Sequence, residues 1–126
     1  MSAAETILVV DDDPDILEAL SEILETEGFS IRRARNGQEA LDRLREGSPA
    51  LILLDLMMPV MDGWEFSKRM KQLKEHAKTP IIVLSADRNV AAKARDIGAV
   101  GHLAKPFELV HLLEMVRSAL SRSVAN

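Results

Sequence analysis

Cysteine is absent from this chain of 126 residues, which excludes disulfides, thiolate zinc sites and cysteine nucleophiles. Tyrosine is also absent, and the aromatic residues are one tryptophan and three phenylalanines, too few for base-stacking platforms or aromatic cages. Positive charge is in short supply: 16 Lys and Arg stand against 20 Asp and Glu, a formal net charge of −4. A nucleic-acid-binding protein needs a basic surface to neutralise phosphates, so we expect no direct nucleic-acid contact.

Long apolar runs are missing as well. The run at residues 50–54 is far shorter than the about 20 residues that a membrane-spanning helix needs. Residues 1–6 lack the basic-then-apolar order of a signal peptide. We therefore expect a cytoplasmic protein that binds no membrane. The length fits one domain, and we expect residues 1–126 to form it, with a core at about 6–120 between short polar termini.

Five runs rich in Ile, Leu and Val, at residues 7–10, 29–34, 51–54, 81–84 and 100–104, are typical of strands. The runs at 7–10, 51–54 and 81–84 are continuously apolar, as strands buried on both faces of a parallel sheet require. The run at 29–34 alternates Phe29 and Ile31 with Ser30 and Arg32, which indicates an edge strand with one wetter face.

The segments between these runs carry the start signals of helices. Asp13 is a good N-cap, and Asn36 with Glu39 and Asp62 with Glu65 have the spacing of capping boxes. We expect a short helix at about 89–97 and a last helix at about 107–120. Five βα units with short links predict an α/β fold with one doubly wound parallel sheet.

The last helix has leucine and valine at helical spacing. We expect these residues to face the core: Leu109, Leu112, Leu113, Val116 and Leu120.

Polar residues follow four of the five predicted strands at the point where each strand ends. They are Asp11, Asp12 and Asp13 after the first, Asp55 after the third, Ser85 after the fourth and Lys105 after the fifth. The carboxyl ends of parallel strands share one edge of the sheet, so these groups should converge. Two like charges about 4 Å apart repel by about 4 kcal/mol at an effective dielectric near 20, and a divalent cation relieves that repulsion. An all-oxygen site of this kind suits Mg²⁺.

Each of these residues also has an ordinary structural explanation. An aspartate after a strand often caps the next helix, as we expect of Asp13 and Asp62. Lys105 alone would be a solvated surface charge, and Ser85 alone a loop residue. The joint pattern is more specific, because each residue falls at the same end of a different strand. A carboxylate beside Mg²⁺ and a lysine is well placed to attack a phosphoryl group.

At these residues the chain resembles the receiver domain of two-component response regulators over nearly its whole length. The resemblance rests on LVVDDD at 8–13, LDLMMPVMDG at 54–63, LSA at 84–86 and KPF at 105–107. It implies a flavodoxin-like (βα)5 fold with a five-stranded parallel sheet in the order 2-1-3-4-5.

The resemblance also implies the roles of the acidic residues. Asp55 would accept a phosphoryl group from a sensor histidine kinase or a histidine phosphotransfer protein. Asp12, Asp55 and the backbone carbonyl of Met57 would ligate Mg²⁺, with Asp11 acting through water.

Further roles follow from the same resemblance. Lys105 would bind a phosphoryl oxygen, and Pro106 would follow a cis peptide bond. Ser85 would move to hydrogen-bond the phosphoryl group and so change an output surface at about 88–120 that binds a downstream protein. His102 stands where the family commonly has Tyr or Phe, a departure that makes coupling to this surface less certain and that could make it sensitive to pH.

The sequence leaves three functions open. The chain could be a phosphorylation-controlled interaction switch that is no enzyme beyond its own phosphorylation and dephosphorylation. It could be an aspartyl-phosphate phosphohydrolase, although Met57 occupies the position where such enzymes carry a second aspartate. It could be a receiver-like module that is never phosphorylated. A stand-alone regulator or a phosphorelay intermediate fits the sequence best, although a domain of a larger hybrid kinase or DNA-binding regulator would look the same.

Overall fold

The computed structural model describes residues 5–125, and the side chains only as far as residue 121. Strands and helices alternate through these residues: β1 (Thr6–Val10), α1 (Pro14–Thr26), β2 (Ser30–Ala34), α2 (Gly37–Leu44), β3 (Leu51–Asp55), α3 (Gly63–Lys71), β4 (Ile81–Ser85), α4 (Val90–Asp96), β5 (Gly101–Ala104) and α5 (Leu109–Ala125). The strands form one parallel sheet in the order β2-β1-β3-β4-β5. The predicted fold class and strand order are therefore confirmed. No helix within residues 5–125 is long and apolar enough to cross a membrane.

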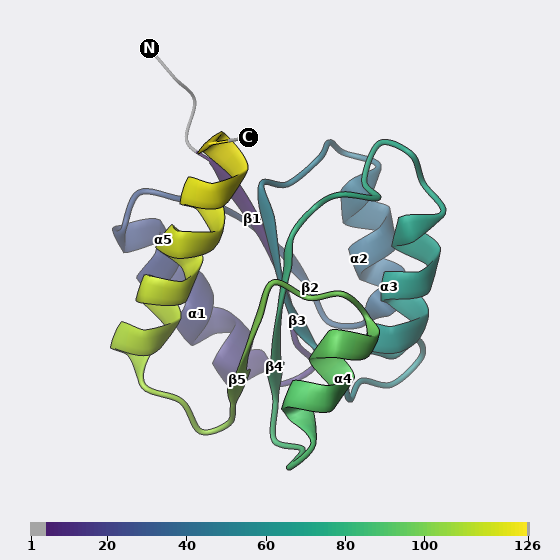
Figure 1. The fold of residues 1–126 in the computed structure, drawn as a ribbon. Helices are drawn as coiled ribbons and strands as arrows, with labels where there is room; N and C mark the ends of the chain where they lie inside the picture. The colour runs from purple at the N-terminus through teal and green to yellow at the C-terminus, as the bar shows by residue number, and fades with distance from the viewer. Residues whose placement is uncertain (1–4, 126) are drawn as a thin grey trace.

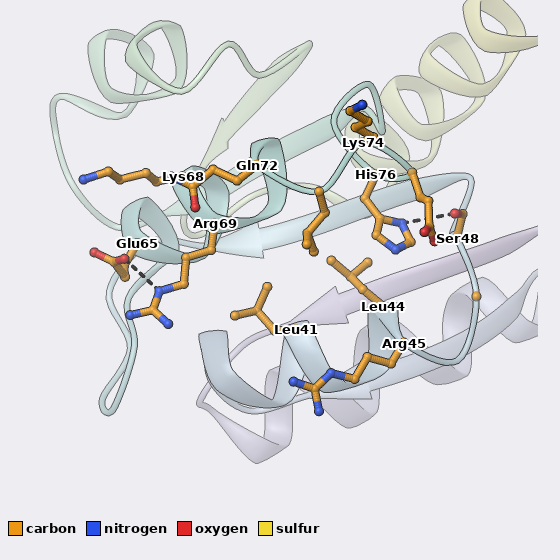
Figure 2. A pocket seen from close by; sticks show the side chains of 13 residues that line it. Leu41, Leu44, Arg45, Ser48, Glu65, Lys68, Arg69, Gln72, Lys74 and His76 are labelled. Carbon is orange, nitrogen blue, oxygen red and sulfur yellow. Dashed lines mark hydrogen bonds and ion pairs between the residues drawn. The ribbon is translucent and has the colours of Figure 1, made fainter.

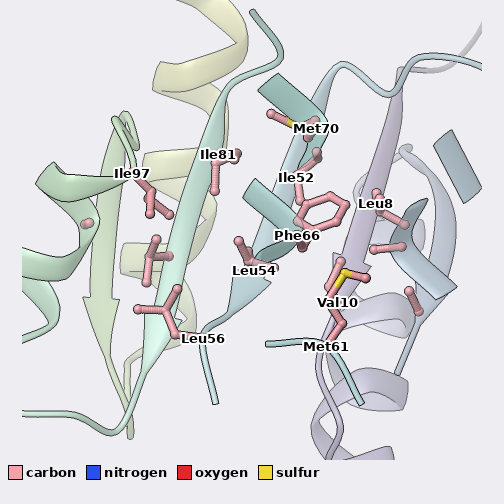
Figure 3. Close-up of a cluster of buried hydrophobic side chains, with 14 of the residues drawn as sticks. Leu8, Val10, Ile52, Leu54, Leu56, Met61, Phe66, Met70, Ile81 and Ile97 are labelled. Atoms are coloured by element: carbon pink, nitrogen blue, oxygen red, sulfur yellow. The ribbon is translucent and has the colours of Figure 1, made fainter. Parts of the chain in front are cut away.

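Helices cover both faces of the sheet. Figure 1 shows α1 and α5 on one face and α2, α3 and α4 on the other. Side chains alternate along each central strand, so neighbouring residues of β1 and β3 enter opposite cores. Leu8 and Ile52 pack beneath α2 and α3 together with Phe66 and Met70 (Figure 3). The alternate residues Ile7, Val9, Leu51 and Leu53 pack beneath α1 and α5. The continuously apolar strands thus have the two buried faces that their sequences predict.

The helix starts agree with the predicted N-caps, but neither of the two predicted capping boxes is complete. The Asp13 carboxylate accepts a hydrogen bond from the Asp15 N–H at 2.9 Å, and Asn36 accepts one from the Glu39 N–H at 2.9 Å. The Glu39 carboxylate, however, accepts from the N–H of Arg35, not from that of Asn36. This carboxylate also pairs with the Arg35 guanidinium. In the second box Asp62 accepts the Glu65 N–H at 2.9 Å, but the Glu65 carboxylate pairs with Arg69. Both boxes are therefore half formed.

The last helix differs from its prediction at both ends. α5 begins at Leu109 and continues to Ala125, five residues past the expected end. Leu112, Val116 and Leu120 are buried as expected, but Leu109 is 41% exposed. Leu113 is half-buried against the same core, whereas Leu109, the first residue of α5, belongs to neither core cluster. The spacing of the leucines could not show where the core ends.

α2 and α3 lie side by side and leave a groove of about 870 Å³ (Figure 2). We call it the α2–α3 groove. It is bounded by Leu41 and Leu44 of α2, by Lys68 and Arg69 of α3 and by residues 72–76 after α3. These last residues follow the carboxyl end of α3. Because Glu65 in the first turn of α3 lines it too, the groove runs along the helix to the edge of the sheet where the strands begin.

The start of α3 is pressed against the end of β3. A Cβ atom added at Gly63 would lie 2.8 Å from the carbonyl oxygen of Asp55 and 2.9 Å from the Cα atom of Leu56. The Gly63 N–H donates to the carbonyl oxygen of Leu56 at 3.0 Å. Only glycine permits this approach, so Gly63 fixes the loop that joins Asp55 to α3.

We expect Gly63→Ala to lower the free energy of unfolding by about 1–3 kcal/mol, because the new methyl group meets backbone atoms that must shift. Gly101→Ala is the matched control. Its methyl group would meet the flexible side chain of Met115, which can move. Urea unfolding of both variants checks this, and equal losses would contradict it.

Candidate functional site

Three carboxylates meet at the carboxyl edge of the sheet. Asp55 is the last residue of β3 and is 5% exposed, Asp11 follows β1 and is 1% exposed, and Asp12 is exposed. One oxygen from each of these side chains lies within 4.8 Å of the others. The convergence predicted for them is therefore present. Asp13, which also follows β1, caps α1 as predicted.

Lys105 brings an ammonium group to the same place. Its Nζ atom lies 2.7 Å from Asp11 Oδ2 and 3.6 Å from Asp55 Oδ2. The Lys105 N–H donates to the carbonyl oxygen of Ser85 at 2.8 Å, which ties the loop after β5 to the end of β4. The peptide bond between Lys105 and Pro106 is cis, as expected.

The two buried carboxylates are held in the same way. The Oδ1 atom of Asp11 accepts the Asp13 N–H at 2.9 Å, and the Oδ1 atom of Asp55 accepts the Met57 N–H at 3.2 Å. In each residue the other oxygen faces Lys105. Backbone donors thus fix the orientation of both carboxylates, while the lysine provides the positive charge between them.

Burial raises the pKa of Asp55 to about 6, and the neighbouring charge of Asp11 adds to this rise. Lys105 and the Met57 N–H act against the rise but do not cancel it. Burial alone would lower the pKa of Lys105. The hydrogen bond to Asp11 and the charges of Asp11 and Asp55 outweigh that effect, so this pKa lies above its ordinary value. Lys105 is therefore a permanent cation among the carboxylates.

Oxygen donors this close together fit a hard divalent cation such as Mg²⁺, which binds through few carboxylates and keeps several waters. The Met57 backbone lies beside Asp55, while the Met57 side chain is 61% exposed. The structure therefore has a carboxylate set of the right chemistry in the place where the sequence predicts a metal.

Ser85 is buried at the end of β4, next to β3 in the sheet. Its hydroxyl oxygen accepts the Asp87 N–H at 3.2 Å, and no hydrogen bond within residues 5–125 joins it to Asp55 or Lys105. Ser85 is thus at the predicted edge, but its hydroxyl is engaged with the loop that leads to α4. His102 is exposed on β5.

A chain of contacts beyond Ser85 was not predicted from the sequence. The Asp87 carboxylate forms an ion pair with Lys93 of α4, and the hydrogen bond from this lysine holds the pKa of Asp87 below its ordinary value. The same Lys93 ammonium lies 5.1 Å from the centre of the Trp64 ring at the start of α3. A six-residue separation across a helix start gives no periodic signal, so only the fold shows this link.

An apolar hollow of about 410 Å³ adjoins Lys105. It is lined by Ile16 of α1 and by Ala86, Lys105, Pro106 and Phe107. The acidic site therefore has an apolar surface directly beside it.

Comparison with known proteins agrees with this geometry. Residues 7–117 match the family model described as the response regulator receiver domain. The chain is 36% identical over 116 residues to sporulation initiation phosphotransferase F of Bacillus subtilis. That match covers 92% of this chain and 94% of the relative. It is 40% identical over 119 residues to the uncharacterized transcriptional regulatory protein YkoG of the same organism. This second match covers 93% of this chain but only 51% of the relative.

A solved structure of the response regulator TrrA from Thermotoga maritima, in complex with Mg(2+)-BeF, is similar at a TM-score of 0.80 and 35% identity. The match covers 91% of this chain and 98% of that one. The family model, the relatives and the strand order agree with the resemblance seen in the sequence. The chain therefore belongs to the family of receiver domains of two-component response regulators.

Proposed function

We propose that Asp55 accepts a phosphoryl group from a sensor histidine kinase or a histidine phosphotransfer protein, in the cytoplasm and with Mg²⁺ bound at the acidic site. We further propose that residues 1–126 act as a single receiver domain, and that phosphorylation changes the surface formed by α4, β5 and α5, which binds a downstream protein. The observation that carries the proposal is the convergence of Asp11, Asp12 and Asp55 around the ammonium group of Lys105.

The metal set that this proposal names is Asp12, Asp55 and the backbone carbonyl of Met57, with Asp11 acting through water. The fit rests on oxygen chemistry and on the mutual distances of the carboxylates, all within 4.8 Å. A bound Mg²⁺ supplies positive charge that offsets the carboxylates and the oxygens of the transferred group.

The chain's own residues would carry the transfer. An oxygen of Asp55 forms a bond to phosphorus while the P–N bond of the donor phosphohistidine breaks, and the departing imidazole nitrogen takes up a proton. Lys105, already 3.6 Å from Asp55 Oδ2, would turn from Asp11 toward the new phosphoryl oxygens. The apolar hollow beside Lys105 provides a surface that the donor protein can contact.

The proposed switch starts at Ser85. Its hydroxyl would leave the Asp87 N–H and bond to the phosphoryl group, which frees the loop whose Asp87 carboxylate holds Lys93 of α4. The surface of α4, β5 and α5 already exposes the apolar side chains of Val100, Leu109 and Val110. A shift of α4 would alter this surface for a protein partner.

Receiver domains are generally not classical enzymes, and we propose no reaction here beyond the chain's own phosphorylation and dephosphorylation. The phosphohydrolase alternative is weakened by Met57, whose exposed thioether can neither donate nor accept a proton for catalysis. Relatives that include transcriptional regulators span about twice this length. We propose that the residues of this chain contact proteins, not nucleic acid.

Incubation with acetyl phosphate and Mg²⁺ should add one phosphoryl group to the chain, measured by intact mass. Asp55→Asn should abolish the adduct, because it removes the nucleophile. Asp62→Asn, at an exposed helix cap seven residues away, is the matched control and should keep it. An adduct that forms without Mg²⁺, or that persists in Asp55→Asn, would rule out the proposed function.

Lys105→Ala should slow phosphorylation by about 100-fold, the usual consequence of removing one charged group that stabilises a transferred anion. The same change removes a positive charge from beside three carboxylates, which leaves them more negative toward a cation. Mg²⁺ affinity should therefore not fall, and Trp64 fluorescence measures it. Lys78→Ala, an exposed lysine distant from the site in the sequence, serves as control. Parallel loss of metal affinity and rate would show instead that Lys105 only maintains the fold.

Without metal, Asp55 should make stability depend on pH. Its pKa rises from 3.8 to about 6 on folding, so the folded state holds its proton more tightly and loses stability as pH increases through this window. Asp55→Asn lacks this loss and should be more stable than wild type by about 3 kcal/mol at pH 7.5, with almost no gap at pH 3, below both pKa values. Urea unfolding at both pH values checks this, and a gap independent of pH would contradict it.

A further inference from the structure

We propose that the α2–α3 groove is a docking site for an acidic amphipathic helix of a partner protein, and that this docking does not depend on phosphorylation. The groove lies on the face of the sheet covered by α2, α3 and α4 (Figure 1), outside the acidic site and its apolar hollow. Its volume of about 870 Å³ is within the range of ligand-binding clefts.

Three leucines form the apolar part, or floor, of the groove. They are Leu41 and Leu44 of α2 and Leu73 after α3, of which Leu44 is buried and Leu73 is 43% exposed. Leu73 continues the spacing of Phe66 and Met70, which are buried, yet it lies past the end of α3 and outside the core. A leucine left in a groove between two helices offers the kind of apolar contact that an amphipathic helix uses.

The rim of the groove is positive, although the whole chain carries a net charge of −4. Four cations line it, Arg45, Lys68, Arg69 and Lys74, against two glutamates. Arg69 is paired with Glu65 at 2.8 Å, and the contact of Arg45 with Asp42 is long and exposed. Within the described residues, Lys68 and Lys74 form no ion pair. Negative charge is concentrated instead at residues 11–27, which hold eight acidic residues and no basic one.

The placement of the cations favours a helix over a small anion. Figure 2 shows Lys68, Arg69, Arg45 and Lys74 around the rim, with their charged ends pointing in different directions. A single phosphate or carboxylate needs donors that converge on one point. Cations spread around an apolar floor instead match acidic residues spaced along the sides of a helix whose apolar stripe faces inward.

One ring nitrogen of a histidine at the end of the groove is open to a ligand. His76 is 5% exposed at the end of the groove, and its Nδ1 atom lies 3.1 Å from the Ser48 hydroxyl. Among residues 5–121, none forms a hydrogen bond with its other ring nitrogen, Nε2. That atom can bond to a polar group at the end of the docked helix.

A second copy of this chain fits the groove less well. Its acidic helix, α1, has Leu17, Leu20 and Leu24 buried in its own core. α1 therefore presents carboxylates without the apolar stripe that the floor requires. The occupant is therefore a helix from another protein.

The test uses the isotope-labelled, unphosphorylated chain and a synthetic amphipathic helix with leucine on one face and glutamate on the other. We expect amide shifts to change along α2, along α3 and at 72–76. A matched peptide with lysine in place of glutamate should not bind. Binding of the lysine peptide, or shifts centred on α4, β5 and α5, would overturn the proposal.

Variants sharpen the test. Lys74→Glu should weaken binding of the glutamate peptide about tenfold at low salt and less at high salt. Lys78→Glu makes the same change four residues further on, at an exposed lysine outside the groove, and should leave affinity unchanged. Leu73→Ser removes a partly exposed floor contact and should weaken binding about tenfold. Equal affinity of wild type, Lys74→Glu and Leu73→Ser would overturn the proposal.

Two further measurements separate the other occupants. If inorganic phosphate alone reproduces the shifts at the groove, the site binds a small anion and the proposal is wrong. If sedimentation shows the chain associating with itself, and Lys74→Glu abolishes this, the occupant is a second copy. The peptide experiment uses no phosphoryl donor, so its failure would leave the proposed role of Asp55 intact.

Discussion

Mutual repulsion among Asp11, Asp12 and Asp55 is the constraint on which the rest of the structure depends. Two of these carboxylates are buried, and among residues 5–121 the ammonium group that pairs with them belongs to Lys105, 94 residues from Asp11 along the chain. That ammonium arrives only when β5 has paired with β4 and the loop after β5 has bonded to Ser85. The negative charge at the ends of the central strands is therefore partly offset by a residue that follows β5, at the far end of the chain.

The fold and the membership of the site follow from the sequence to a large extent. Continuous apolar runs predict the central strands, and the residues after them predict the acidic edge, because parallel strands end together. The pairing within the site does not follow. Lys105 lies closer to Asp11 than to Asp55, and the Ser85 hydroxyl bonds to Asp87. Such choices depend on fractions of an ångström and on loop paths, which residue types and spacing do not record.

Helical spacing of apolar residues also gives a wrong prediction of burial at the end of a helix. Leu109 is in phase with the buried leucines of α5 but is exposed and belongs to neither core cluster. Leu73 is in phase with Met70 but lies past the end of α3 and lines the α2–α3 groove. Both leucines are exposed at surfaces for which we propose protein partners. An apolar residue that the periodicity assigns to the core and the structure leaves outside is thus informative about binding.

α4 is short and weakly capped, and this affects how easily it unfolds locally. It has seven residues, its N-cap Asn89 makes no side-chain hydrogen bond, and of its residues only Val90 and Ala94 are buried. α1, by contrast, has thirteen residues and a cap that accepts two backbone N–H groups. Opening α4 exposes little apolar surface and breaks few bonds, so its local unfolding free energy should lie well below that of the whole domain. The sheet and the other helices then stay in place, and a rearrangement at Ser85 displaces α4, the element with the lowest local stability.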